Sequence, residues 1–335
     1  MGKLKILLQR AKEGSFKRFF HNLNQVHRET RRPRVVLFVD MVYCMLHYGV
    51  GYLEYVTFGF CGKPRAKRKT FFTMNDNVAL VRRLNNRDCY ELFDDKLAFN
   101  RRFESFLRRD YVDLREGFEG FEKFLAGKTV FFAKQTRSFG GKGVEKLRLA
   151  EHPDHKRLYD ELMEQKMYLA EGLIVQHPKM DELCARSLNT VRVVTVVNDR
   201  NEAKLIYALV RIGNGETDVD NISSGGMYTL LDAEGTITHP VFCDKTVSYY
   251  EAHPKSGKVF RGFRVPYFAE AVALCKEAAL VEPRMRYIGW DVGITPEGPV
   301  LVEGNNLPGY DMAQNHRFHD DGCGMRPVFD AAVRG

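Results

Sequence analysis

Three residues late in the chain carry oxygen-bearing side chains at a spacing that suits a metal ion. Asp291 lies in one strand-like run, and Glu303 and Asn305 lie in the next, after the turn Thr295-Pro296-Glu297-Gly298. A hairpin through this turn places Asp291 opposite the second run, where Glu303 and Asn305 share one face because side chains repeat every two residues. Such oxygens suit Mg²⁺, which keeps other positions for water and phosphate. The pattern indicates a magnesium-nucleotide site, although solvent-facing strand residues would show the same spacing.

A second group of residues could hold phosphates. Lys134 ends an apolar strand-like run, and the glycine-bearing turn Gly140-Gly141-Lys142-Gly143 follows it. Glycines let backbone N–H groups approach a phosphate chain, and ammonium groups neutralise its charge. The spacing differs from the Walker A and dinucleotide-binding patterns. Taken alone, it also fits an ordinary glycine turn with solvated lysines.

Two arginines, Arg192 and Arg211, lie inside strand-like runs. A charged side chain is costly to bury without a partner, so each position indicates either an ion pair or a binding role. Arg192, within Asn189-Thr190-Val191-Arg192, is the stronger candidate for binding.

Composition limits the classes of function. The chain has 335 residues, 44% of them hydrophobic and 28% charged, which predicts a folded protein with two or three lobes. No apolar run is long enough to span a membrane and no signal peptide is evident, so we expect a cytoplasmic protein. Seven cysteines without CxxC spacing argue against a disulfide framework. The net charge of +8 comes without a nucleic-acid motif, which favours an anionic ligand over nucleic acid.

The first third of the chain is predicted to be mostly helical. Residues 1–30 are amphipathic and should pack on the body of the protein or on a membrane surface. The apolar run from Val35 fits a buried strand or a helix, and a helix ending at Gly49 is favoured because the run continues to that residue. Further helices are expected over 77–86, capped by Asp76, and over 95–108, capped by Asp94.

Strand character begins at residue 129 and dominates the rest. Alternating β-branched residues predict a meandering antiparallel sheet. The expected strands are 129–134, 191–197, 203–212 and 227–231, followed by the hairpin that carries Asp291. Helices are expected over 154–167 and 266–281.

The order of these motifs resembles that of the ATP-grasp superfamily. The series comprises Lys134, Gly140-Gly141-Lys142-Gly143, Glu171-Gly172-Leu173-Ile174-Val175, Asp291 and Glu303-Gly304-Asn305. More narrowly, the chain is similar to the sugar-transfer-associated ATP-grasp family over residues 35–315. This similarity is carried by Ser187-Leu188-Asn189-Thr190-Val191-Arg192-Val193-Val194-Thr195, by Val219-Asp220-Asn221-Ile222-Ser223-Ser224-Gly225-Gly226 and by Gly289-Trp290-Asp291.

The resemblance implies an α+β fold in which two α+β lobes grip ATP between antiparallel sheets, with a helical N-terminal region. It divides the chain into a helical region over 1–110, a small lobe with the glycine loop over 111–176, and a large lobe with the catalytic site over 177–335.

The resemblance also implies roles for individual residues. Nucleotide contacts fall on Lys134, Gly140, Gly141, Lys142, Gly143, Glu171, Gly172, Leu173 and Ile174. Many relatives carry a second acidic residue where Gly172 stands, which leaves Asp181 as a substitute for the ribose contact. Metal ligands are Asp291, Glu303 and Asn305, for Mg²⁺ or Mn²⁺.

Catalysis would rest on Arg192, Arg211 and Lys142, which stabilise the transferred phosphoryl group. Substrate or acceptor would contact Asn189, Asn221, Ser223, Ser224, Gly225 and Gly226, although a plain turn between strands fits the last five equally well.

The implied activity is ATP- and Mg²⁺-dependent ligation of a small carboxylate or amino acid to an amine, through an acyl-phosphate, with release of ADP and phosphate. A kinase acting on a hydroxyl, of a small molecule or a sugar-linked group, is the first alternative. A nucleotide-binding module without turnover, in surface-polysaccharide assembly, is the second. The partners are ATP, the acid and an amine or hydroxyl acceptor, with no nucleic acid. The acid, the acceptor and the oligomeric state are not specified by the sequence.

Overall fold

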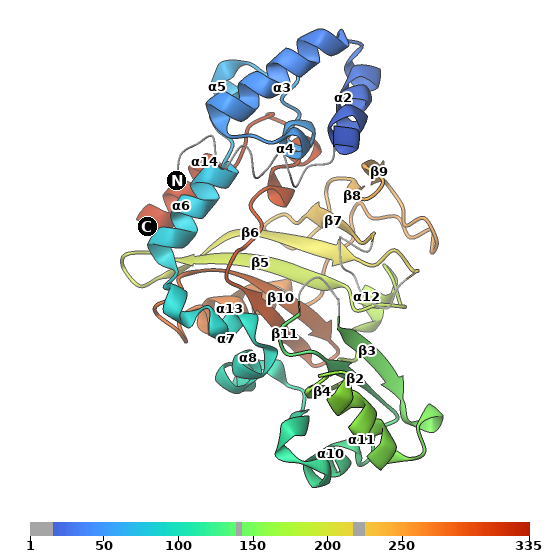
Figure 1. Ribbon diagram of the computed structural model, residues 1–335. Coiled ribbons are helices and arrows are strands. Elements are labelled where there is room, and N and C mark those ends of the chain that lie inside the picture. Colours follow the sequence, from blue (N-terminus) through green and yellow to red (C-terminus); the bar gives the residue numbers. More distant parts are fainter. Residues whose placement is uncertain (1–15, 139–142, 217–224) are drawn as a thin grey trace. The chain divides into compact units, whose positions relative to one another are not determined.

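Residues 16–138, 143–216 and 225–335 are described by the computed structural model (Figure 1). The chain forms two compact units, which are described separately below. Unit 1 comprises residues 1–79 and 309–330, and unit 2 comprises residues 80–308 and 331–335. The division into regions 1–110, 111–176 and 177–335 stays a prediction. In the described part of the chain, no helix is both long and apolar enough to cross a membrane.

Unit 1 is helical, as its sequence predicts. Its first helices are α2 (Phe16–Thr30), α3 (Arg34–Tyr48), α4 (Tyr52–Thr57), α5 (Arg65–Arg68) and the start of α6 (Met74–Leu84). Its later part contains η5 (Met312–Gln314), η6 (His316–Phe318) and most of α14 (Arg326–Arg334). Helix α3 ends at Gly49 as expected, because this residue adopts φ +71° and its N–H donates to the carbonyl of Cys44.

The core of unit 1 is aromatic, with an ion pair beside it. Phe58 and Phe60 both pack on Phe71, at centroid distances of 4.8 and 5.1 Å. The Arg68 guanidinium donates to both carboxylate oxygens of Asp40, at 2.8 and 2.7 Å. These contacts fasten α3 and α5 to one another.

Two predicted helix starts are wrong by a residue or more. Asp76 lies inside the first turn of α6, where its carboxylate accepts from the N–H and hydroxyl of Thr73. Asp95, rather than Asp94, caps the next long helix, because its carboxylate accepts from the N–H groups of Leu97 and Ala98. That predicted helix is also divided in two, with Phe103 between the parts.

Unit 2 holds the remaining helices. They are η1 (Arg87–Cys89), α7 (Glu91–Asp94), α8 (Lys96–Arg102), α9 (Glu104–Leu107), η2 (Leu114–Glu116), α10 (Phe118–Leu125), η3 (Leu149–Glu151), α11 (His155–Glu164), α12 (Pro178–Asp181) and α13 (Phe268–Ala278). The predicted helices over 154–167 and 266–281 correspond to α11 and α13, with shorter bounds.

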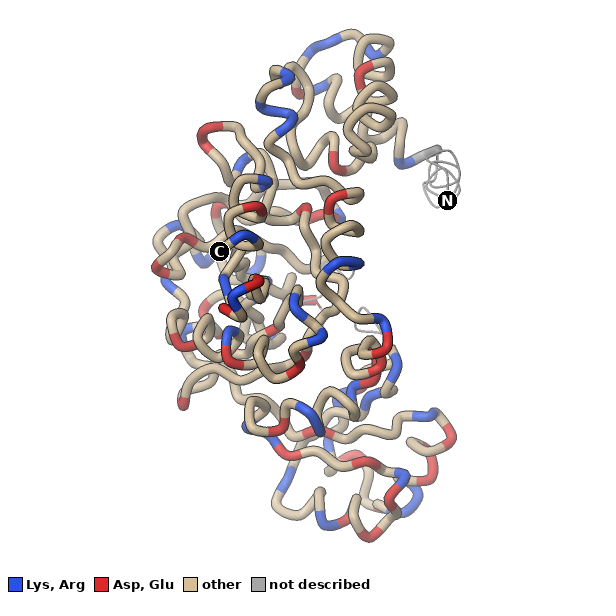
Figure 2. The backbone as a smooth tube through the Cα atoms, turned by 90° about the vertical axis from the view of Figure 1, so that its left-hand side faces the viewer, with Lys and Arg blue, Asp and Glu red and all other residues tan. Residues whose placement is uncertain are grey.

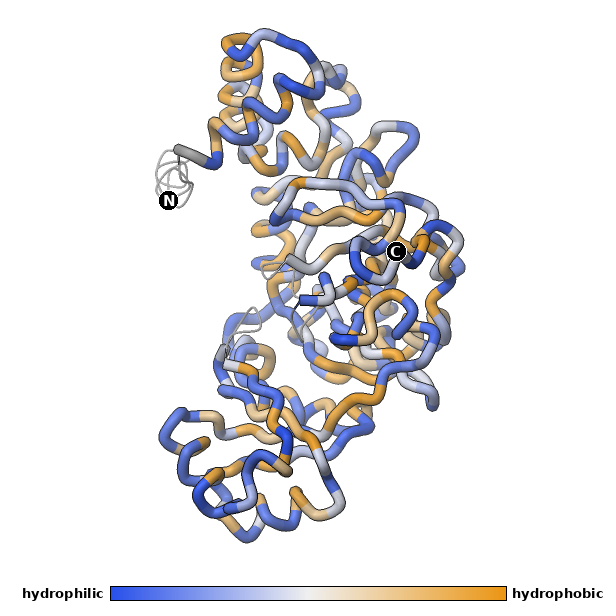
Figure 3. Tube along the Cα trace, turned by 90° about the vertical axis from the view of Figure 1, so that its right-hand side faces the viewer, coloured by the Kyte–Doolittle hydropathy of each residue, from blue (hydrophilic) through white to orange (hydrophobic). Residues whose placement is uncertain are grey.

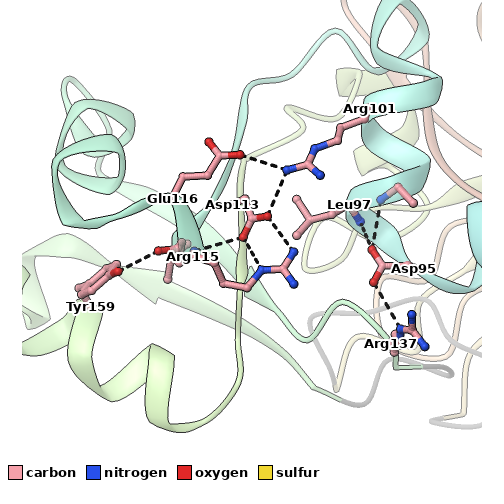
Figure 4. Close-up of polar contacts among 10 residues, drawn as sticks. Asp95, Leu97, Arg101, Asp113, Arg115, Glu116, Arg137 and Tyr159 are labelled. Atoms are coloured by element: carbon pink, nitrogen blue, oxygen red, sulfur yellow. Dashed lines mark hydrogen bonds and ion pairs between the residues drawn. The ribbon is translucent and has the colours of Figure 1, made fainter.

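A four-stranded antiparallel sheet forms one part of unit 2. Its strands are β1 (Tyr111–Asp113), β2 (Val130–Lys134), β3 (Val144–Arg148) and β4 (Leu169–Gly172), in the order β1-β4-β2-β3. Its core packs Phe121 of α10 and Leu158 of α11 against Phe131. Near this sheet, the carboxylate of Asp113 accepts from Arg115 and Arg101, and the Tyr159 hydroxyl donates to the carbonyl of Leu114 (Figure 4).

A seven-stranded antiparallel sheet forms the other part. Its strands are β5 (Thr190–Val197), β6 (Ala203–Ile212), β7 (Met227–Leu230), β8 (Val241–Cys243), β9 (Ser248–Tyr250), β10 (Tyr287–Thr295) and β11 (Gly298–Asn305). The order β11-β10-β5-β6-β7-β8-β9 confirms the predicted meander, with the hairpin added at one edge. Strands β5 and β10 are buried along their whole length, and hydrophobic segments of the chain are orange in Figure 3. The fold is therefore α+β, with two antiparallel sheets and a helical N-terminal region.

The β10–β11 hairpin has the predicted register. Thr295 pairs with Gly298 across the turn, Asp291 pairs with Glu303, and Gly289 pairs with Asn305. A bulge after Asp291 lets the turn-proximal and site-proximal parts of the hairpin differ in alignment by one residue. Asp291 and Glu303 are thus direct cross-strand neighbours.

Candidate active site

A cavity of about 560 Å³ lies in unit 2. Its wall includes Phe132 and Lys134 from the four-stranded sheet and Arg192, Asp291 and Glu303 from the seven-stranded sheet. This volume falls within the range of small-molecule sites, which is roughly 300–1,000 Å³. Charged groups that lie more than one hundred residues apart in the chain therefore face one cavity.

One row of charged side chains crosses three strands of the large sheet. Arg192 of β5 pairs with Asp291 of β10, which pairs in turn with Glu303 of β11. Arg192 donates to both oxygens of the Asp291 carboxylate, in the second case through Nη2 at 2.9 Å. Arg211 of β6 donates to Oδ2 of Asp291 at 2.8 Å. We call these four residues the Asp291 cluster.

The pKa values of the two carboxyl groups in the Asp291 cluster are shifted in opposite directions. Burial disfavours the ionised form of Asp291, but the guanidinium groups of Arg192 and Arg211 outweigh it and hold its pKa well below the usual range. Desolvation and the adjacent Asp291 charge raise the pKa of Glu303, which shares a hydrogen bond with Asp291. A cation beside Glu303 would relieve both unfavourable effects.

The residues present fit a divalent cation of the magnesium type. Asp291, Glu303 and Asn305 all line the cavity and supply oxygen donors. Arg192 and Arg211 occupy three of the about four lone-pair sites of the Asp291 carboxylate, so the remaining one, shared with Glu303, would be the site for a metal. In the described residues, no group of three or more His, Cys, Asp and Glu side chains is placed to hold a metal. A magnesium site here would therefore rest on two carboxylates, one amide and oxygens of the substrate.

A second cluster of buried charge lies on the four-stranded sheet. The carboxylate of Glu171 on β4 accepts from Arg109 at 3.1 Å, from Asn100 at 2.6 Å and from the Lys134 ammonium. Burial works against ionisation of Glu171, but the charges of Arg109 and Lys134 dominate and hold its pKa below the usual range. We call these four residues the Glu171 cluster. Its carboxylate holds Lys134 at the cavity wall, a role that local sequence pattern does not predict.

The segment after β4, which the sequence predicts to be a nucleotide hinge, lines the cavity. Strand β4 ends at Gly172, and Leu173, Ile174 and Val175 continue along the cavity without strand pairing. Leu173 is 43% exposed, which leaves its side chain available to a ligand. Asp181 also lines the cavity, and its carboxylate accepts from Gln176 at 2.7 Å.

The structure gives a physical reason for glycine at position 172. A Cβ atom built there would lie 2.4 Å from Oδ1 of Asp110, closer than any real contact. The Gly172 N–H also donates to the carbonyl of Asp110 at 3.0 Å. An acidic side chain at this position would not fit without displacing Asp110.

Lys96 is a cavity residue that the sequence analysis missed. It begins α8, and its ammonium donates to the carbonyl and hydroxyl oxygens of Ser138, at 2.5 and 3.1 Å. Burial lowers its pKa. Asp95 next to it pairs with Arg137 at 3.5 Å (Figure 4). A lysine at the start of an ordinary helix carries no signal in a single sequence, because only the fold turns this end of α8 toward the cavity.

Some residues singled out in the sequence lie away from the cavity. Asn189 is fully buried, and its amide contacts Gln176, Met180 and Cys184. Gly225 and Gly226 precede β7 and are absent from the cavity wall described here. Gly143 follows the loop and adopts φ +62°. Six of the singled-out residues lie outside the described residues: Gly140, Gly141, Lys142, Asn221, Ser223 and Ser224.

Comparison with known proteins gives one family and a set of distant folds. A family model described as sugar-transfer associated ATP-grasp matches residues 75–317. No curated protein sequence matches the chain.

Similar solved structures include N5-carboxyaminoimidazole synthetase from Staphylococcus aureus complexed with ADP, with TM-score 0.44 and 11% identity, covering 68% of this chain and 48% of that one. D-alanine-D-alanine ligase from Coxiella burnetii gives TM-score 0.43 and 10% identity over 73% of this chain and 58% of that one. D-cycloserine synthetase DcsG gives TM-score 0.42 and 14% identity over 77% and 78%. The chain spans about half of the length of the N5-carboxyaminoimidazole synthetase chains, 46% and 48%.

Proposed function

Because the chain belongs to the sugar-transfer-associated ATP-grasp family, whose model matches residues 75–317, we propose that it is an ATP- and Mg²⁺-dependent carboxylate–amine ligase. It activates a small carboxylate or amino acid as an acyl-phosphate and releases ADP and phosphate. The acceptor is an amine or, as the less favoured case, a hydroxyl.

A single observation supports this proposal most directly. One cavity has a cationic wall, with Lys96 and Lys134, and a wall where two carboxyl groups face each other beside two arginines. The first wall suits the phosphates of ATP, and the second suits a metal and a phosphoryl group in transfer.

The nucleotide is bound, in this proposal, between the two sheets. Leu173 and Ile174 flank the adenine ring, the backbone of Glu171 to Val175 contacts its edge, and Asp181 takes the ribose. Lys134 and Lys96 neutralise phosphate oxygens, with Lys142 and the glycines of the 140–143 turn as further predicted contacts.

Asp291, Glu303 and Asn305 would hold Mg²⁺, which when bound neutralises charge on the β- and γ-phosphates. Arg192 is anchored through Asp291, so its guanidinium is oriented before the substrate arrives. Arg211 is oriented in the same way by Oδ2 of Asp291.

Two bond exchanges complete the reaction. An oxygen of the substrate carboxylate attacks the γ-phosphorus, and the bond to the β,γ-bridging oxygen breaks to release ADP. The amine nitrogen then attacks the acyl carbon, the C–O bond to phosphate breaks, and the nitrogen loses a proton to solvent. Arg192 and Arg211 stabilise the negative charge of the phosphoryl group in the first exchange. Asn189, Gly225 and Gly226 do not line this cavity, so the proposal gives them no contact with the reacting groups. Asn221, Ser223 and Ser224 stay predicted acceptor contacts.

Product analysis tests the proposal. Amino acids and small carboxylic acids are screened in pairs with amines for nucleotide products, and the new product is identified by mass. ADP and phosphate formed only when acid and amine are both present support the ligase. AMP and pyrophosphate overturn it. Phosphate retained on the product assigns a kinase instead, and nucleotide binding without turnover in the full screen assigns a binding module.

A further inference from the structure

Helix α3 of unit 1 exposes a continuous apolar face. The exposed fractions are 75% for Val35, 60% for Val39 and 59% for Leu46, whereas Leu37 and Met41 on the opposite side are buried. These exposed positions recur at helical spacing and therefore form one stripe. The α3 face comprises Val35, Val36, Val39, Tyr43 and Leu46.

The α3 face carries no charge. The only Asp, Glu, Lys and Arg residues of α3 are Arg34, at its first position, and Asp40. Asp40 is taken up inside the unit by Arg68 and by the hydroxyl of Tyr55, the latter at 2.6 Å. A helix that is apolar on all sides normally lies in a core or in lipid, and large exposed apolar patches mark interaction sites.

The chain's excess of positive charge lies in the sequence that precedes α3. Residues 1–34 contain ten Lys and Arg and two Glu, so they carry a net charge of +8, equal to that of the whole chain. Residues 35–335 are therefore neutral in sum. Arg28, in the last turn of α2, and Arg31 and Arg32, in the turn that leads into α3, are exposed. Elsewhere, Lys and Arg are interspersed with Asp and Glu (Figure 2), apart from a basic run over residues 63–69.

We propose that the α3 face docks on the surface of an anionic lipid bilayer. Helix α3 has 15 residues, fewer than the roughly 20 that a spanning helix needs, so it lies in the plane of the interface. Its apolar side chains enter the acyl boundary, while Arg28, Arg31 and Arg32 contact anionic headgroups.

Charge favours a bilayer over a second copy of the chain or an acidic protein as the partner of the α3 face. A second copy of the chain docked face to face would bring two strongly cationic segments together, which is electrostatically unfavourable. An acidic protein would satisfy the arginines but would leave the five apolar side chains to a separate, matching patch. A bilayer supplies an apolar interior and an anionic surface in one layer. The inference is independent of the proposed ligase activity, because the cavity lies wholly in unit 2.

Vesicle sedimentation with the full chain is the first test. We expect the protein to sediment with phosphatidylcholine vesicles that contain about 30% phosphatidylglycerol, and not with phosphatidylcholine alone. Raising NaCl from about 0.1 to 0.5 M should weaken binding, because salt screens the arginines. Absence of sedimentation with the anionic vesicles overturns the proposal.

Matched variants distinguish binding through the α3 face from nonspecific binding through other exposed apolar residues. Val39→Ser with Leu46→Gln should bind at least about tenfold more weakly. Val259→Ser with Leu280→Gln, at unit 2 positions 60% and 45% exposed, should bind like the unaltered chain. Arg28→Gln and Arg31→Gln should each cost about fivefold. Equal binding by both double variants overturns the proposal. So does a lipid-free dimer, seen by light scattering, that only the α3 double variant dissociates, because the face then belongs to a second copy.

A fluorescence measurement locates the helix directly. The single tryptophan, Trp290, is 1% exposed and should be insensitive to lipid. In Leu46→Trp, brominated lipids in anionic vesicles should quench the added emission, whereas in Val259→Trp they should not. Equal response in the two variants contradicts insertion of α3.

Discussion

The two buried charge clusters of unit 2 differ in what they lack. In the Glu171 cluster, one carboxylate is surrounded by Arg109, Lys134 and Asn100, so its own charge is satisfied and positive charge is left over. In the Asp291 cluster, two carboxyl groups are cross-strand neighbours, and Glu303 has a raised pKa beside the ionised Asp291.

This difference identifies complementary ligands. The Glu171 cluster and Lys96 are suited to an anion, whereas the Asp291 cluster is suited to a cation placed beside Glu303. The proposed ligand, magnesium with a nucleoside triphosphate, would satisfy both needs at once. The four-stranded sheet thus supplies positive charge to the cavity, and the seven-stranded sheet supplies the carboxyl groups.

Removing the central carboxylate of the Glu171 cluster should have the largest effect. Glu171→Gln leaves two buried cations with little compensation, and we expect it to lower the free energy of unfolding by about 3–5 kcal/mol. Urea unfolding followed through Trp290, which lies in the same unit, measures this. Glu119→Gln is the control, because Glu119 and Lys123 form an exposed pair (84% and 76% accessible side chains) that should contribute less than about 1 kcal/mol. Similar losses in both variants would show that the Glu171 cluster is not electrostatically coupled.

Neutralising Glu303 tests the other cluster. Glu303→Gln keeps the shape but removes a proposed metal ligand, so turnover should fall by about 10²–10³-fold while ATP binding persists. Steady-state rates measure turnover, and isothermal titration calorimetry measures ATP binding. Glu297→Gln, in the turn of the same hairpin, should retain its rate. Unchanged turnover in Glu303→Gln would remove the metal assignment.

Lys96 adds positive charge to the cavity wall but donates to Ser138 and not to Glu171, so it tests anion binding apart from the Glu171 cluster. Lys96→Met should weaken ATP binding by about 10–100-fold, the range for loss of a charge-assisted contact. Titration with ATP and with adenosine measures it, and adenosine binding should change little because it lacks phosphates. Lys123→Met is the exposed control. A similar loss for adenosine would mean that Lys96 holds the fold rather than phosphate.

The smallest expected effect concerns Gly172, at the end of β4. Gly172→Ala should cost about 1 kcal/mol of stability, because the new Cβ crowds Asp110, whose side chain is partly exposed and can shift. Thermal unfolding of Gly172→Ala with Asp110→Ala should recover most of this loss relative to Asp110→Ala alone. If the second change recovers nothing, crowding by Asp110 does not explain the glycine.

Much of the fold followed from local pattern. The β10–β11 hairpin and the meander β5–β6–β7 were predicted because alternation and turn residues are local signals. The predicted helix caps were less accurate. Asp94 and Asp95 are adjacent and equally able to cap, so only the backbone path selects Asp95.

The partners of the charged residues could not be predicted. Arg192 and Asp291 are 99 positions apart and Lys134 and Glu171 are 37 apart, and strand pairing at such separations leaves no trace in a single sequence. The ion-pair interpretation of Arg192 and Arg211 was an open alternative in the sequence, and the structure shows that both pair with Asp291.

The sequence by itself determined the family, the alternating strands and the oxygen-bearing residues Asp291, Glu303 and Asn305, because each depends on residues close together in the chain. Only the tertiary structure decided that Glu171 holds Lys134, that Lys96 reaches the cavity and that the α3 face is exposed. Those properties depend on burial and on the register of distant segments, which arise only when the whole chain packs.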